Sequence, residues 1–125
     1  MILDTNAVSA ILAGEPAIES VLQSARVLVL PAIVAGEYRY GISASRIQNE
    51  LTKAFEQLTQ QVTFAPVDQP ITRRYAALRR VLKEAGTPIP ENDVWIAATV
   101  RHYELPLLSR DAHFDVVPEL KRISW

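Results

Sequence analysis

The chain opens with a short apolar run that ends in an acid, and this order limits what the segment can fold into. Ile2 and Leu3 precede Asp4, which is followed by Thr5 and Asn6, two residue types that suit a helix N-cap. The next apolar residues recur at helical spacing. We predict a buried strand that brings Asp4 to its carboxyl end, where open α/β sheets bind their ligands. The alternative interpretation is that Asp4 only caps the helix.

Segments typical of strands and helices alternate along the rest of the chain. Apolar periodicity predicts helices over 17–25, 46–60 and 68–85, and another that begins at Glu91. A further helix follows Pro31, which suits its first turn, and ends near Gly41. Strands are predicted over 27–30, 62–65, 107–108 and 121–125, with a polar loop over 109–115. This alternation predicts an α/β fold whose parallel sheet is covered on both faces.

Composition narrows the class of protein. A chain of 125 residues without a linker predicts a single domain over residues 1–125. A net charge of −1 excludes a global basic field, and 0 Cys excludes both a disulfide framework and a thiolate zinc site. The longest apolar run, 27–36, contains Pro31 and is far below the roughly 18 residues of a membrane span. With no basic segment before Asp4 to indicate a signal peptide, we expect a cytoplasmic protein that does not enter membranes.

Four carboxylates stand where predicted strands end or helices begin: Asp4, Glu37, Asp93 and Asp111. If the strands are parallel, all four approach the same edge of the sheet. Carboxylates crowded in one cleft repel each other, and a divalent cation makes such a cluster tolerable. Oxygen ligands without Cys favour Mg²⁺ or Mn²⁺ over Zn²⁺. A site of this kind suits phosphoryl chemistry.

Each of these acids also has a simpler interpretation. Asp93 at a helix N-terminus is favoured by the macrodipole without any ligand, and Glu37 could be a solvated helix residue. Asp111 lies in a charged loop in which Asp115 competes for the same role. Glu91 could likewise replace Asp93. The prediction therefore depends on the joint placement of the acids and not on any one of them.

Histidines and basic residues give weaker signals. His102 and His113 could form a general acid–base pair that needs no metal, although His102 falls well inside a helix. Five basic residues between Arg73 and Lys83 could bind the phosphates of a nucleic acid, but a solvated helix face is the favoured interpretation.

Four segments taken in order resemble a known set of motifs: Leu3-Asp4-Thr5-Asn6, Glu37-Tyr38-Arg39-Tyr40-Gly41, Glu91-Asn92-Asp93-Val94-Trp95-Ile96-Ala97-Ala98 and Ser109-Arg110-Asp111-Ala112-His113-Phe114. They resemble the motifs of PIN-domain ribonucleases, and the whole chain is similar to the VapC-type toxins of bacterial toxin–antitoxin pairs. The resemblance implies a PIN-like three-layer α/β/α sandwich with a mainly parallel central sheet, usually homodimeric. It also implies an Mg²⁺- or Mn²⁺-dependent endoribonuclease that cleaves RNA and is neutralised by a cognate antitoxin.

Matching positions assign roles to individual residues. The resemblance implies a catalytic and metal-binding pocket formed by Asp4, Glu37, Asp93 and Asp111. Asp4 and Asp93 are the expected direct ligands, with Glu37 and Asp111 binding directly or through water. Hydrogen-bonding neighbours that orient the carboxylates are expected to be Thr5, Asn6 and Ser109. Asp115 stays an alternative to Asp111 as the fourth acid. Trp95 departs from the Leu that the family commonly has there, and we expect it in the core or at a dimer surface.

Mechanistically, we hypothesise in-line attack of water on a phosphodiester, which leaves a 5′-phosphate and a 3′-hydroxyl. The non-enzymatic alternative is a catalytically silent PIN-like module that only binds RNA or an antitoxin. The stripe Ile47, Leu51, Phe55 and Leu58 is expected to pack in the core. In the family, the corresponding helices help to form the groove that receives the antitoxin.

Overall fold

Five short strands form one parallel sheet in the order β3-β2-β1-β4-β5 in the computed structural model, which describes all residues from 1 to 125. The strands are β1 (Ile2–Leu3), β2 (Val29–Pro31), β3 (Thr63–Ala65), β4 (Leu107–Leu108) and β5 (Arg122–Ile123). The helices are α1 (Thr5–Leu12), α2 (Pro16–Gln23), α3 (Ala32–Ile42), α4 (Gln48–Thr59), α5 (Gln69–Glu84), α6 (Glu91–Tyr103) and the 3₁₀ helix η1 (Ala112–Val116). The predicted α/β fold with a parallel sheet is confirmed.

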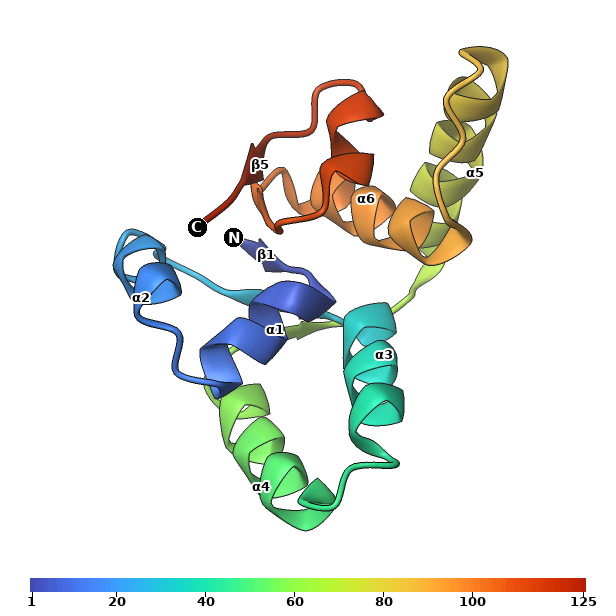
Figure 1. The fold of residues 1–125 in the computed structure, drawn as a ribbon. Helices are drawn as coiled ribbons and strands as arrows, with labels where there is room; N and C mark the ends of the chain where they lie inside the picture. The colour runs from blue at the N-terminus through green and yellow to red at the C-terminus, as the bar shows by residue number, and fades with distance from the viewer.

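The strand order places helices on both faces of the sheet. The chain moves outward from β1 to β2 and β3, then returns and moves the other way through β4 and β5. Because parallel crossovers are right-handed, this reversal sends the later helices to the opposite face. Figure 1 shows the result: α1, α3 and α4 lie below the strands, whereas α5, α6 and η1 lie above them. The reversal occurs between β1 and β4, which are neighbours in the sheet.

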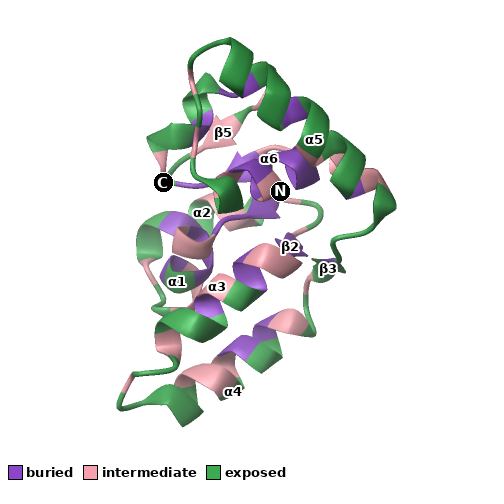
Figure 2. Cartoon of the chain, turned by 90° about the vertical axis from the view of Figure 1, so that its right-hand side faces the viewer, coloured by how far each residue is buried: buried purple, intermediate pink, exposed green.

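The central strands are buried on both faces. Ile2, Leu3, Leu30, Leu107 and Leu108 are all 0% exposed. Burying each such side chain contributes roughly 1.5–3 kcal/mol before the loss of chain entropy. Figure 2 shows the same pattern, with buried residues on the inward sides of the helices and exposed residues outside. The carboxyl ends of β1 and β4 are therefore fixed by the best-packed part of the molecule.

Two local predictions were wrong. Pro31 ends β2 in an extended conformation and precedes α3 instead of lying in its first turn. The same helix ends at Ile42, near Gly41 as predicted. Residues 109–115 do not form an open loop, since the Asp111 side chain accepts a hydrogen bond from the backbone N–H of His113 (2.8 Å) and begins η1.

Other helix boundaries follow the predicted signals. Asp68 caps α5 by accepting a hydrogen bond from the backbone of Ile71, and Gly86 follows the end of this helix with a φ of 71°. Phe55 and Leu58 of the α4 stripe are buried, as expected, whereas Ile47 is 49% exposed. None of the helices is long and apolar enough to cross a membrane.

Candidate active site

The candidate site lies where β1 and β4 end side by side. Leu3 is in register with Leu108, so the residues that follow, Asp4 and Ser109, are neighbours across the sheet. The Ser109 hydroxyl donates to Asp4 Oδ2 at 2.5 Å, and both residues are buried. This is the point at which the chain reverses its direction across the sheet, the usual place for a ligand site in an open α/β fold.

Asp4 is held by three donors and is only 5% exposed. Besides Ser109, the backbone N–H of Thr5 donates to Oδ1 (2.7 Å) and Asn6 Nδ2 donates to Oδ2 (2.8 Å). Burial nevertheless raises the pKa of Asp4 above its ordinary value, the three hydrogen bonds oppose this rise, and the charge of Asp111 adds to it. Asp4 thus caps α1 and also faces the site, so the two interpretations of this residue are compatible.

Asp93 approaches Asp4 from the first turn of α6, and its side chain is 15% exposed. Burial, followed by the charges of Asp111 and Asp4, raises the pKa of Asp93 from 3.8 to about 6, while His113 acts in the opposite direction. Glu91, the sequence alternative to Asp93, has a side chain that is 64% exposed and pairs with Arg79 at 3.4 Å. The structure therefore brings Asp93, and not Glu91, into the cluster.

Glu37 enters from α3, on the other side of the sheet. The Thr5 hydroxyl donates to Glu37 Oε1 at 3.4 Å, which links this carboxylate to the loop that carries Asp4. The pKa of Glu37 is raised by burial first and by the charge of Asp4 second. Glu37 therefore lies close enough to Asp4 for the charge of Asp4 to raise its pKa.

The fourth position has two candidates, and only Asp111 faces the other acids. Its charge raises the pKa values of both Asp4 and Asp93. Asp115 instead forms two hydrogen bonds with the Arg122 guanidinium, at 2.7 and 2.8 Å, and this contact lowers the pKa of Asp115. Arg122 also donates to the Ser109 carbonyl (3.1 Å), so the Asp115–Arg122 pair supports the end of β4 from outside the cluster.

His113 belongs to the cluster, whereas the sequence indicates it only as a possible acid–base partner of His102. Its Nδ1 lies 3.4 Å from Asp93 Oδ2 and 3.2 Å from Asp111 Oδ1. The only signal in the sequence was its position two residues after Asp111. His102 lies nine positions beyond Asp93 on α6, roughly 13 Å along the helix axis. The predicted pair of histidines is therefore not assembled around one substrate atom.

Small polar side chains join the acids into one network. Ser109 Oγ accepts from the Asp111 backbone N–H (2.9 Å), and Asn6 Nδ2 donates to the same hydroxyl (3.3 Å). Asn6 Oδ1 accepts from the backbone N–H of Arg110 (3.1 Å). These contacts fix the segment that bears Asp111 against the one that bears Asp4. Thr5, Asn6 and Ser109 thus occupy the positions expected of residues that orient carboxylates.

The charge of the cluster suits a divalent cation. None of its four carboxylates forms an ion pair with Arg or Lys, and the His113 imidazole is the sole nitrogen base beside them. Oxygen atoms of Asp93 and Asp111 and a nitrogen of His113 lie within 4.8 Å of one another. Asp4 is buried and the other three acids are partly buried, and carboxylates held away from water without a cationic partner are the donor set that a hard divalent cation satisfies. An open pocket of about 460 Å³ adjoins this group at Asp111 and His113 and is bordered on its other side by the 86–89 loop.

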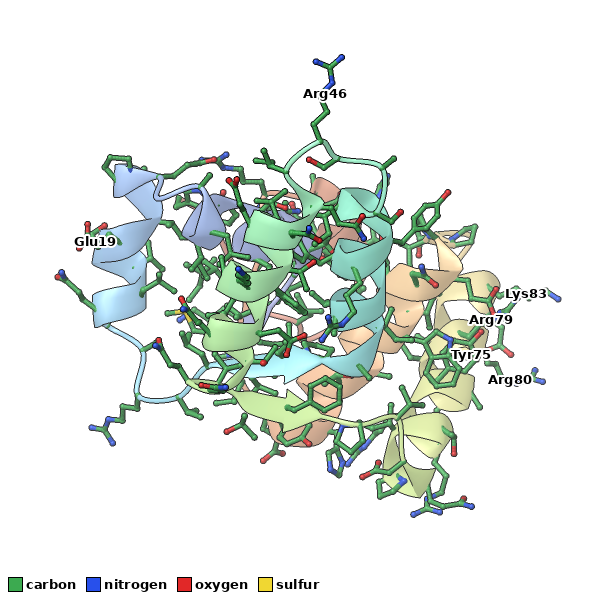
Figure 3. The ribbon with its side chains drawn as sticks, turned by 90° about the horizontal axis from the view of Figure 1, so that it is seen from below. Glu19, Arg46, Tyr75, Arg79, Arg80 and Lys83 are labelled. Carbon is green, nitrogen blue, oxygen red and sulfur yellow. The ribbon has the colours of Figure 1, made fainter.

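The basic helix and Trp95 lie apart from this network. In Figure 3, Arg80 and Lys83 extend outward from α5. Arg79 contacts Glu91 and Tyr75, and Arg80 pairs with Glu84, so part of this charge is compensated locally. Trp95 stacks on Tyr75 with ring centroids 3.7 Å apart, which joins α6 to α5. Trp95 is partly buried and lies outside the buried core, so its place at a dimer surface stays a prediction.

Known proteins resemble this chain over nearly its full length. Toxin FitB of Neisseria gonorrhoeae is 31% identical over 122 residues, which cover 89% of this chain and 87% of FitB. Ribonuclease VapC5 of Mycobacterium tuberculosis is 28% identical over 116 residues, covering 90% and 84% of the two chains. The solved structure of FitAB bound to an IR36 DNA fragment superposes with a TM-score of 0.84 at 26% identity, covering 98% and 93%.

The family profile described as the PIN domain matches residues 1–120. The match includes β1, β4 and all the acids that the fold gathers at their carboxyl ends. The chain therefore belongs to the PIN-domain family.

Proposed function

We propose that this protein is an endoribonuclease that depends on a divalent cation, Mg²⁺ or Mn²⁺, and acts as the toxin of a toxin–antitoxin pair. The observation that supports it most is the cluster of Asp4, Glu37, Asp93 and Asp111, which have no Arg or Lys partner. Three of these acids also have raised pKa values. Relatives named as ribonucleases and as a toxin support the same activity.

Asp4 and Asp93 are the proposed direct ligands, and Glu37 and Asp111 complete the negative pocket. A divalent cation in such a site activates water and offsets the charge that develops on a phosphate. Ser109 and Asn6 hold the Asp4 carboxylate in one orientation through their hydrogen bonds to Oδ2. Water attacks phosphorus in line and the bond to the 3′-oxygen breaks, so the products carry a 5′-phosphate and a 3′-hydroxyl.

Cleavage of RNA by purified variants tests this assignment. Asp4→Asn and Asp93→Asn should each lower the cleavage rate at least about a hundredfold, a barrier increase of about 2.7 kcal/mol. Glu91→Gln is the matched control, because Glu91 begins the same helix as Asp93 and faces Arg79. Asp111→Asn should impair cleavage much more than Asp115→Asn. EDTA should abolish cleavage and added Mg²⁺ should restore it. Undiminished cleavage by both Asp4→Asn and Asp93→Asn would overturn the assignment.

The proposed protein partner is a cognate antitoxin, and we expect the toxin itself to form a homodimer. A solved relative is described as FitAB bound to DNA, a two-component assembly. A basic side chain of the antitoxin that reached the acidic pocket would inhibit by compensating its charge. Expression of the wild type alone should arrest growth, whereas expression of Asp4→Asn should not. Growth arrest by both would favour the binding-only alternative.

A further inference from the structure

We propose that His113 is a direct nitrogen ligand of the divalent cation, so that the site prefers Mn²⁺ to Mg²⁺. This inference rests on the proposed function, because it assumes that the acidic cluster binds a cation. It adds a ligand of a different chemical type to the four carboxylates. It also assigns a role to the one imidazole that lies against them.

The positions of the donor atoms support direct ligation. His113 Nδ1 lies 3.2 Å from Asp111 Oδ1 and 3.4 Å from Asp93 Oδ2. Adjacent ligands around an ion with bonds of about 2.1 Å are roughly 3 Å apart in octahedral geometry and roughly 3.4 Å apart in tetrahedral geometry. The separations in this protein fall in or near that range. The imidazole nitrogen therefore lies at a ligand-to-ligand distance from each oxygen, and the three donor atoms lie within 4.8 Å of one another.

The backbone around His113 is fixed and does not belong to a free loop. Its N–H donates to Asp111 Oδ1 at 2.8 Å, and the next residue, Phe114, is 0% exposed. Figure 1 shows η1 beside α6, the helix whose first turn provides Asp93. The His113 side chain is 59% exposed, so an ion and its remaining waters can reach the nitrogen from solvent.

Ligand chemistry then predicts which ion is favoured. Mg²⁺ is bound through oxygen and keeps much of its water, whereas imidazole is a good ligand for first-row transition ions. The protein has 0 Cys and its other histidine, His102, is remote from Asp93 on α6. A nitrogen ligand from the chain therefore has to come from His113. If His113 acted only as a cation beside the acids, its removal would strengthen the binding of both Mg²⁺ and Mn²⁺, which is the opposite prediction.

Electron spin-echo envelope modulation of bound Mn²⁺ tests the ligand itself. A coordinated imidazole ¹⁴N modulates the echo, and this modulation should be present in the wild type and in His102→Ala but lost in His113→Ala. Calorimetry should show Mn²⁺ binding weakened about tenfold in His113→Ala, and Mg²⁺ binding changed by less than about threefold. Wild-type protein labelled with ¹⁵N-histidine gives the same test without a substitution, since its modulation should change frequency.

The outcomes separate this inference from the proposed function. Mn²⁺ that binds to the wild type without nitrogen modulation would overturn ligation by His113 and leave the acidic site in place. Tighter binding of both ions by His113→Ala would also overturn it and indicate a counter-charge. A wild-type protein that binds neither ion would contradict the proposed function as well.

Discussion

Replacing Asp93 by Asn should stabilise the metal-free protein at neutral pH, although it removes a proposed metal ligand. The Asp93 side chain is only 15% exposed, and its carboxyl group faces the charges of Asp111 and Asp4. Both conditions favour its neutral form in the folded state. Asparagine resembles this neutral form and cannot ionise.

The size and sign of the effect follow from the pKa of Asp93. A rise from 3.8 to about 6 on folding corresponds to about 3 kcal/mol. Because the folded pKa is the higher one, the stability that Asp93 contributes by staying neutral is fully present below pH 3.8. It falls between pH 3.8 and about 6 and is lost above that. Asp93→Asn should therefore exceed the wild type in free energy of unfolding by up to about 3 kcal/mol at about pH 7.5, with a much smaller difference at about pH 4.

Urea denaturation in EDTA, followed by fluorescence of the 2 Trp residues, measures the free energy of unfolding of the wild type and of Asp93→Asn at each pH. Glu91→Gln is the control and should show no pH-dependent gain. Added Mn²⁺ should stabilise the wild type by mass action but not Asp93→Asn. A variant that is no more stable than the wild type at about pH 7.5, or a difference that is the same at both pH values, would refute the reasoning.

Two further predictions concern the network and the chemistry. Ser109→Ala removes the donor to Asp4 Oδ2 and the acceptor for the Asp111 N–H, so Mn²⁺ affinity measured by calorimetry should fall about tenfold with the fold retained. Unchanged affinity would show that this hydroxyl does not orient the ligands. RNA fragments should carry 5′-phosphates, which makes them direct substrates for a 5′-phosphate-dependent exonuclease. Fragments with 2′,3′-cyclic phosphate ends would instead indicate a metal-free mechanism.

Much of the fold could be predicted because each local signal agreed with the global pattern. Ile2 and Leu3 point to opposite faces of the sheet and both are apolar, as a central parallel strand requires. Helix α5 has a capping Asp68 at its start and Gly86 just beyond its end. Strands that are all parallel must end at one edge, so the gathering of the acids followed from topology. The hydrogen-bond and ion-pair partners of each acid do not follow from the topology.

Side-chain direction decided what the sequence left open. Asp111 and Asp115 are four positions apart in one charged segment, but Asp115 pairs with Arg122 of β5 whereas Asp111 lies against His113. The contact between Asp115 and Arg122 spans seven positions, from η1 to β5, and no helix or strand periodicity predicts it. The contact of His113 with Asp93 was not predictable either. It depends on the 3₁₀ helix that Asp111 begins, where the sequence predicts a loop. Tertiary contacts made these distinctions, and periodicity does not record them.

The central claim is that side chains from α6 and from the ends of β1 and β4 bind one cation together. Anomalous diffraction from a crystal soaked in Mn²⁺ tests it most directly. We predict an anomalous peak in contact with the carboxylates of Asp4 and Asp93, with Asp111 beside it. A well-ordered crystal with no peak at these residues, or with Mn²⁺ bound only elsewhere, would contradict the account.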